Sequence, residues 1–247
     1  MLAFEQVIGS ATLLAARQLW IASGVTLAFA SIARLMRGVT RSGAVAGAAV
    51  CFLLYAGAGP GAFLALVSVF VLTWLTTRWG YQRKQKLGTA ERSDGRTASQ
   101  VLANLGLAAM CAALHGIRGG SAIYSLALAG ALSEAAADTV SSEVGQGVGA
   151  KARLVTSWQP VPSGTDGGVS LPGTLAGIAG ALAVSSVCAL GGLVRWRVLG
   201  VPAGAGACGM LADSYMGALL ERRGLLNNDA VNFFSTLIAV AMVFLLA

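Results

Sequence analysis

Long apolar segments constrain this chain more than any other feature of its sequence. We identify eight of them, at roughly residues 18–36, 42–58, 61–78, 98–115, 120–138, 172–194, 200–220 and 229–247. About 20 apolar residues cross a bilayer as a helix, and backbone groups in lipid must be satisfied within their own segment. The sequence therefore predicts an all-α, polytopic membrane protein with seven or eight transmembrane segments in a single domain, 1–247. The second and third segments, joined only by Gly-Pro-Gly, should form a tight hairpin.

Composition supports a membrane protein and argues against a soluble domain. Charged residues make up 11% of the chain and hydrophobic residues 56%, whereas soluble domains carry about 25% charged residues. The net charge of +7 does not indicate nucleic-acid binding, because the basic residues collect in the loops, as membrane orientation predicts. The four cysteines lie far apart in apolar segments, a pattern typical of packing thiols rather than of a metal or redox site.

The distribution of arginine and lysine predicts an orientation. If the first loop is cytoplasmic, thirteen basic residues fall on the cytoplasmic side and four on the other. Basic side chains accumulate on the cytoplasmic side of membrane proteins. We therefore expect both termini to be non-cytoplasmic and two long loops, about 79–97 and 139–171, to contribute to a site that faces the cytoplasm. In a bacterium the membrane would be the plasma (inner) membrane.

Polar side chains extend into four of the apolar segments near this predicted cytoplasmic face. Glu134 and Asp138 share one helix face because they are four residues apart. The remaining members of the four groups are Ser142 and Glu143, Gln100 and Asn104, Asp213 and Ser214, and Asp229, Asn232 and Thr236. A charge in a membrane segment costs roughly 2.5–3.5 kcal/mol on insertion scales and usually marks a functional site. We expect the four groups to converge on one pocket.

Several carboxylates in one pocket would repel one another without a cation between them. Hard oxygen ligands suit Mg²⁺, and we expect Asp138, Glu143 and Asp213 to hold it, directly or through water. Two of the polar residues have simpler interpretations that the sequence leaves open. Asp229 is also suited to the start of a helix, where acids complement the helix dipole, and Asn104 to a hydrogen bond between helices.

A glycine-rich run precedes the sixth segment. Its polar and glycine positions include Gly164, Thr165, Asp166, Gly167, Gly168 and Ser170, and Thr174 follows. Glycines let successive backbone N–H groups converge on an anion, and the helix start that follows adds to this. Lys151, Arg153 and Arg96 are candidates for the positive charge. The run predicts a phosphate cradle, with a plain surface turn as the alternative, and the sequence contains no Walker or GxGxxG fingerprint.

Six blocks of sequence carry a family resemblance. They are GVTRSGAVAG (38–47), GRTASQVLANLG (95–106), ADTVSSEVG (137–145), PVPSGTDGGVSLPGT (160–174), ADSYMGALL (212–220) and NDAVNFFST (228–236). Together they resemble the integral membrane DUF92 family, which includes plant phytyl-phosphate kinase and the transmembrane protein 19 group. The resemblance covers the chain from about residue 38 to its end.

The resemblance implies transfer of the γ-phosphate of a nucleoside triphosphate, with CTP as the expected donor, to an isoprenoid monophosphate, which gives the prenyl diphosphate. Asp138, Glu143 and Asp213 then hold Mg²⁺, and Asp229 and Asn232 complete the catalytic group. The expected substrate and nucleotide contacts come from Arg96, Gln100, Asn104, Glu134, Ser142, Lys151, Arg153, the glycine-rich run with Thr174, and Ser214. Membrane lipids are the other expected partners.

Two other functions remain open from the sequence. A CTP-dependent lipid cytidylyltransferase would release pyrophosphate and form a CDP-lipid, so its product distinguishes it from a kinase. An ion-coupled transporter would use intramembrane acids to carry coupling ions. A transporter should have polar residues along a path through the bilayer, whereas here the outer half of each segment is almost wholly apolar.

Overall fold

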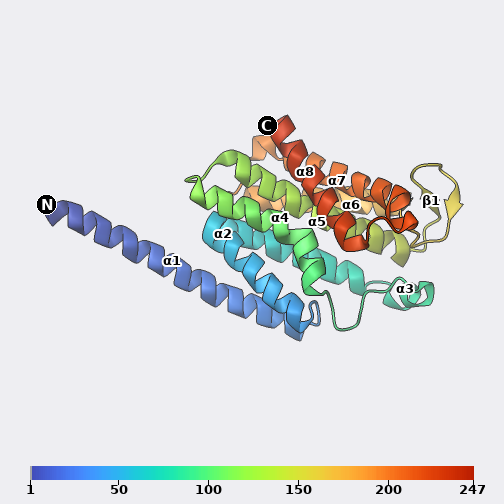
Figure 1. Ribbon diagram of the computed structural model, residues 1–247, viewed down its shortest axis with the longest axis horizontal. Helices are drawn as coiled ribbons and strands as arrows, with labels where there is room; N and C mark the ends of the chain where they lie inside the picture. The colour runs from blue at the N-terminus through green and yellow to red at the C-terminus, as the bar shows by residue number, and fades with distance from the viewer. Residues whose placement is uncertain (1) are drawn as a thin grey trace.

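The computed structural model describes the backbone of residues 2–247 and the side chains of residues 17–247. Met1, where we predict a non-cytoplasmic N-terminus, lies outside the described residues. Eight α-helices form within 2–247 (Figure 1): α1 (Leu2–Leu35), α2 (Arg41–Arg78), α3 (Tyr81–Leu87), α4 (Ala98–Ile117), α5 (Ala122–Gly147), α6 (Leu171–Leu190), α7 (Gly200–Leu219) and α8 (Asn228–Leu246). Two short 3₁₀ turns, η1 (Trp196–Val198) and η2 (Glu221–Arg223), flank α7.

Five helices of the described chain are long and apolar enough to cross a membrane. They are α1 from Arg17 onward, α2, α4, α6 and α8. α5 and α7 are also long, at 26 and 20 residues, but they carry the acidic groups and are not among the five. The predicted helical membrane architecture is confirmed, while the count of seven or eight spans stays a prediction.

α2 is a hairpin of two helices, as its Gly-Pro-Gly sequence predicts. Gly59 leaves the helical conformation with a φ of +79°. The two halves lie side by side, since the rings of Tyr55 and Phe63 have centroids 6.0 Å apart. At the other end, the indole of Trp74 donates to the carbonyl of Met36, just before the first half begins. The hairpin therefore returns the end of α2 to the level of its start.

α5 is the central helix. It packs against α2, α4, α6, α7 and α8, and its residues from Ala127 to Ala137 are all buried. Glycines allow the close approach of α7, because a Cβ on Gly206 would lie 2.8 Å from Ser133 and one on Gly209 would collide with Glu134. α5 also continues to Gly147, so residues 139–147, which we expected in the loop, are helical.

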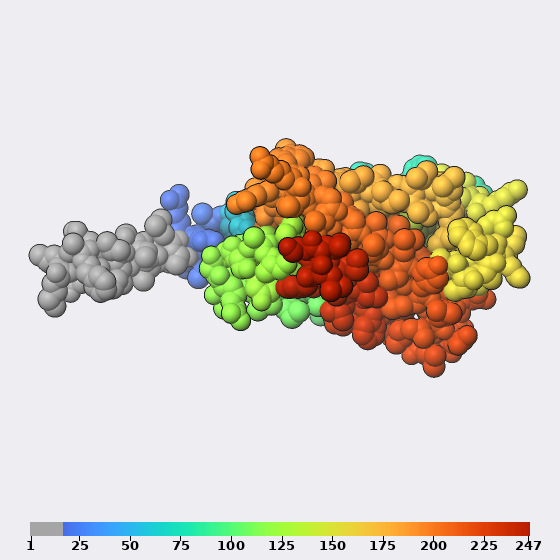
Figure 2. Space-filling view, turned by 90° about the horizontal axis from the view of Figure 1, so that it is seen from above, coloured from blue at the N-terminus to red at the C-terminus, as the bar shows by residue number. Residues whose placement is uncertain are grey.

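The loop after α5 forms a small antiparallel sheet that the all-α expectation did not include. β1 (Ala152–Leu154) lies between β2 (Pro160–Val161) and β3 (Gly168–Val169). Ala152 pairs with Val161, and Leu154 with Gly168. Figure 2 shows this loop, in yellow, projecting from one end of the helical body, and Figure 1 shows α3 at the same end. The two long polar loops therefore share one end of the molecule.

Candidate active site

A polar cavity of about 210 Å³ lies where the glycine-rich run meets the ends of α5 and α7. We call it the polar cavity. The predicted site residues that line it are Asp138, Ser142, Gly164, Thr165, Asp166, Gly167, Gly168, Ser170, Asp213 and Ser214. Glu221 of η2 lines it as well. Members of two of the four predicted polar groups, on α5 and α7, therefore meet here with the glycine-rich run. The groups on α4 and α8, which we expected in the same pocket, do not line it.

The glycine-rich run reaches α7 because two glycines leave room for it. Gly167 has a φ of +72°, a conformation that residues with a Cβ rarely adopt, and a Cβ there would collide with Ala218. A Cβ on Gly217 would lie 2.8 Å from the backbone nitrogen of Gly167. These glycines hold the run against the helix that carries Asp213.

Several groups of the run are used to build its turn. The N–H of Gly168 donates to the carbonyl of Thr165 at 2.8 Å, and the Thr165 hydroxyl donates to the carbonyl of Pro162 at 2.8 Å. Ser170 caps α6 by accepting from the N–H of Gly173. The turn and the predicted cradle are therefore the same segment, and only part of its polar atoms is free to face a ligand.

Asp138 and Asp213 bring two carboxyl groups together in the polar cavity. Both side chains line it, and each is close enough for its charge to act on the other. The Oδ2 of Asp213 is buried and has no hydrogen-bond partner among the described residues. Mg²⁺ commonly binds one or two carboxylates together with substrate phosphates and water. An unpartnered oxygen beside a second carboxyl group fits such an ion.

Glu143 does not join that pair. Its carboxylate accepts from the Lys84 ammonium at 2.5 Å and from the Thr77 hydroxyl at 3.0 Å. Lys84 is fully buried and also donates to the carbonyls of Thr76 and Thr77 at the end of α2. Within residues 17–247 no three Asp, Glu, His or Cys side chains are arranged to hold a metal ion. The predicted set of three carboxylates is therefore corrected to two, because Lys84, which we counted only as loop charge, holds the third.

Glu134 lies outside the polar cavity, in the contact between α5 and α8. Its side chain is fully buried, and its two oxygens accept from the hydroxyls of Ser235 at 2.7 Å and Thr236 at 2.6 Å. The predicted role in substrate binding is wrong for this geometry, because the carboxylate is used between helices.

Lys151 and Arg153 do not line the polar cavity either. Ala152, which stands between them, lines it. Because side chains alternate across a strand, Arg153 faces the other side of β1, where it donates to the carbonyl of Trp158 at 2.7 Å. Lys151 is exposed. The positive charge expected for the phosphates does not come from these two residues.

Four further predicted residues do not line the polar cavity. Gln100 belongs to a capping box at the start of α4. Asn227 caps α8 by accepting from a backbone N–H, and Asp229 stands in the first turn of that helix. Asn232 is buried on α8, and Thr174 lies in the first turn of α6. The observed place of Asp229 matches the simpler interpretation of that residue.

Glu221 is a site residue that the motifs did not identify. It lies in η2, outside the membrane-spanning helices. Burial raises the pKa of its carboxyl group to about 7, and the negative charges of Asp166 and Asp138 add to the effect. No sequence signal set it apart from the other charges after α7.

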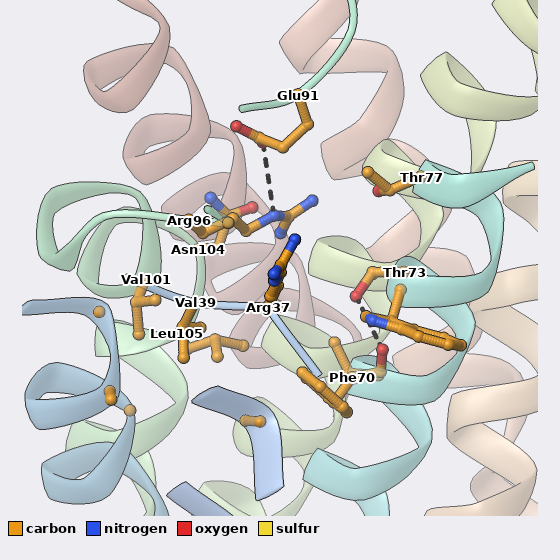
Figure 3. Close-up of a pocket in the computed structure, with 18 of the residues that line it drawn as sticks. Arg37, Val39, Phe70, Thr73, Thr77, Glu91, Arg96, Val101, Asn104 and Leu105 are labelled. Atoms are coloured by element: carbon orange, nitrogen blue, oxygen red, sulfur yellow. Dashed lines mark hydrogen bonds and ion pairs between the residues drawn. The ribbon is translucent and has the colours of Figure 1, made fainter. Parts of the chain in front are cut away.

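A second cavity, of about 430 Å³, lies among α1, α2, α4 and residues 91–96 (Figure 3). We call it the amphipathic cavity. The polar side chains of Arg37, Glu91, Arg96 and Asn104 lie toward one end of it, which we call its mouth. Apolar side chains such as Val101, Leu105 and Phe70 lie toward the other end, which we call its depth (Figure 3). Arg96 and Asn104 are the predicted site residues that line it. Sequence reasoning missed the cavity, because its apolar side chains belong to segments that we expected to face lipid.

Arg96 connects the two cavities. Its guanidinium lines the amphipathic cavity and donates to the hydroxyl of Thr139 at 3.1 Å. It is also close enough to Asp138 to interact with its charge. Glu91 lies 3.9 Å from its Nε (Figure 3), and a short parallel bridge with Val39 fixes its backbone.

The model of the family described as integral membrane protein DUF92 matches residues 24–240. The chain belongs to this family. This DUF92 protein is 34% identical over 227 residues to an uncharacterised membrane protein of Methanocaldococcus jannaschii. The alignment covers 90% of this chain and 91% of the relative. The family resemblance is thereby confirmed, and the protein is a multi-pass integral membrane protein.

Two other relatives come from Arabidopsis thaliana and from Synechocystis. The DUF92 protein is 31% identical over 206 residues to protein VTE6, chloroplastic, of Arabidopsis thaliana, across 80% of this chain and 62% of VTE6. It is 31% identical over 195 residues to an uncharacterised membrane protein of Synechocystis, across 77% of this chain and 75% of the relative. No solved structure matches the chain.

Proposed function

We propose that the protein is a membrane-embedded kinase that transfers the γ-phosphate of a nucleoside triphosphate, CTP in the first instance, to phytyl or another prenyl monophosphate. The observation that carries the proposal is the meeting of two carboxyl groups, a glycine-rich turn and the Arg96 guanidinium at one end of the helical body. Membership of the family that includes phytyl-phosphate kinase supports the choice of substrate class. On this proposal the site faces the cytoplasm, where nucleotides are available.

Phosphoryl transfer depends on the positioning of the reactants and on positive charge more than on a general base. An oxygen of the acceptor monoester attacks the γ-phosphorus, and the bond from that phosphorus to the β–γ bridging oxygen breaks. The electron pair leaves with the nucleoside diphosphate. The acceptor is already an anion, so no Ser-His-Asp arrangement is needed to activate it.

The chain's own residues supply the remaining parts. The glycine-rich run and the hydroxyls of Ser142 and Ser214 line the cavity in which the nucleotide phosphates would lie. Asp138 and Asp213 would hold Mg²⁺, which neutralises phosphate charge when bound. Arg96 places a fixed positive charge beside them, and such preorganised charge stabilises a transition state without reorganisation.

The test is a product assay on the purified protein in lipid nanodiscs. Phytyl and geranylgeranyl monophosphate are each supplied with Mg²⁺ and with CTP, ATP, GTP or UTP, and the lipid products are separated by chromatography. The proposal predicts a prenyl diphosphate with at least one nucleotide. A CDP-lipid would establish nucleotidyl transfer instead, and the absence of both products would reject the proposal.

A further inference from the structure

The amphipathic cavity combines two chemistries that a single ligand would have to match. Its depth is lined by apolar side chains of α1, α2 and α4: Phe29, Leu66, Val69, Phe70, Val101 and Leu105. Four arginines line it, Arg37, Arg78, Arg92 and Arg96, against one acid, Glu91. A volume of about 430 Å³ falls within the range of roughly 300–1,000 Å³ for small-molecule pockets. The cavity therefore suits an anionic head group with an apolar chain.

Two guanidinium groups at the mouth have N–H donors left over for a ligand. Arg37 makes no side-chain hydrogen bond or ion pair with any residue in the described part of the chain, and it extends toward the mouth near Arg96 (Figure 3). Its backbone is held at a φ of +55°, which is uncommon for a residue with a Cβ and is often found at functional positions. Arg96 has the 3.1 Å bond to Thr139 and the longer contact with Glu91. Each guanidinium offers five N–H donors in a geometry that matches phosphate.

We propose that the amphipathic cavity is the acceptor site, and that it holds a prenyl monophosphate with its phosphate at Arg37 and Arg96 and its chain in the apolar depth. This inference rests on the proposed function, and it gives the acceptor, the second substrate of the proposed kinase, a binding site. Arg96 then brings the acceptor phosphate next to Asp138, at the boundary with the polar cavity. The chain of the lipid extends among α1, α2 and α4, away from the nucleotide.

A glycine in the wall allows the cavity to be filled without disturbing the fold. Gly47 lines the cavity, and a Cβ built there meets no atom within 4 Å. Gly47→Leu therefore places a side chain in the space that the prenyl chain would occupy. Gly106→Leu on α4 is the matched control, because a Cβ at Gly106 also meets nothing within 4 Å and Gly106 does not line the cavity.

The experiment measures binding of geranylgeranyl monophosphate in nanodiscs without nucleotide, through the fluorescence of Trp74, which lines the cavity. We expect Gly47→Leu to weaken binding by at least ~10-fold and Gly106→Leu to leave it unchanged. Arg37→Gln should weaken binding of the phosphate by about 10-fold, as expected for loss of a hydrogen bond to a charged group. The same variant should leave the weaker binding of geranylgeraniol unaltered.

A second measurement adds inorganic phosphate to the bound lipid. At a concentration equal to that of the lipid, inorganic phosphate should not displace it. Wild-type affinity in both Gly47→Leu and Arg37→Gln would overturn the acceptor site. Displacement by inorganic phosphate alone would also overturn it, since the cavity would then be a simple anion site. Because no nucleotide is present, lipid binding without later phosphorylation would count against the proposed kinase and not against this site.

Discussion

Arg96 donates a 3.1 Å hydrogen bond to Thr139, the residue that follows Asp138 on α5. The bond fixes the loop between α3 and α4 to the helix that carries the first acid of the polar cavity. It also sets a guanidinium at the place where the polar and amphipathic cavities approach each other. If the two cavities take the two substrates, the reacting phosphates meet beside Arg96.

Arg96→Lys should lower kcat by roughly 10²-fold, because lysine keeps the charge but loses the planar fork that binds phosphate oxygens at two points. Thr139→Val is the matched control, since it removes the same hydrogen bond and leaves the guanidinium in place. It should cost only a few-fold. Equal losses in the two variants, measured by steady-state kinetics, would mean that Arg96 only ties the loop to α5.

Asp213→Asn should abolish turnover while the melting temperature stays equal or rises, because the change removes one of the carboxylates that line the polar cavity without changing volume. Loss of Mg²⁺-dependent protection against thermal unfolding should accompany it. Asp94→Asn, in the exposed loop, is the control and should behave as wild type. Retained turnover in Asp213→Asn would remove this residue from the site.

Lys84→Met should destabilise the protein by about 3–5 kcal/mol, because it leaves Glu143, whose side chain is only 13% exposed, without its partner. The double variant Lys84→Met, Glu143→Leu should recover a large part of that loss, since neither charge then remains. Denaturation in detergent measures both. If Glu143 instead held a metal ion, the double variant would show no recovery, and Glu143→Gln would lose activity at unchanged stability.

Glu221 predicts a pH dependence near neutrality. Its pKa is raised from 4.5 to about 7 by burial and by Asp166 and Asp138, so the folded state binds the proton more tightly than the unfolded state. The contribution to stability is fully present below about pH 4.5 and is lost as the pH rises through 7.

Ionised Glu221 also adds negative charge beside the nucleotide phosphates. The KM for nucleotide should therefore rise between about pH 6 and 8, and Glu221→Gln should flatten that rise; a parallel profile in the variant would exclude Glu221 as the cause.

Orientation can be tested with impermeant thiol reagents on intact cells. A cysteine at Ser157, which is exposed in the loop between β1 and β2, should react only from the cytoplasmic side. One at Arg118, after α4, should react only from the opposite side. Cys208 must first be replaced, since it is exposed. Labelling of Ser157→Cys from outside would reverse the topology and separate the site from cytosolic nucleotide.

The sequence predicted those parts of the structure that depend on local pattern. Apolar length located the helices, the Gly-Pro-Gly turn located the hairpin within α2, and the acids of α5 and α7 with the glycine-rich run located the polar cavity. Each of these signals lies within a short stretch of chain. Asp138 and Asp213 were found because carboxylates are rare in apolar segments.

The parts that the sequence did not predict depend on partners far apart in the chain. Lys84 and Glu143 are 59 residues apart, and no local pattern shows that one neutralises the other. Arg153 was assigned to the phosphates because its strand, whose alternation turns it away, was not foreseen. The amphipathic cavity needs residues of three helices, and each of them alone looks like a lipid-facing side chain.

A prenyl-phosphate kinase passes the γ-phosphate, and no other part of the nucleotide, to the lipid. The most direct measurement supplies geranylgeranyl monophosphate and Mg²⁺ to the protein in nanodiscs with CTP labelled at either the α- or the γ-phosphorus, and with the equivalent labelled ATP. Label should enter the lipid fraction from the γ-position alone, and the product should be the diphosphate. Label transferred from the α-position, or from neither position with either nucleotide, would contradict the proposed kinase activity.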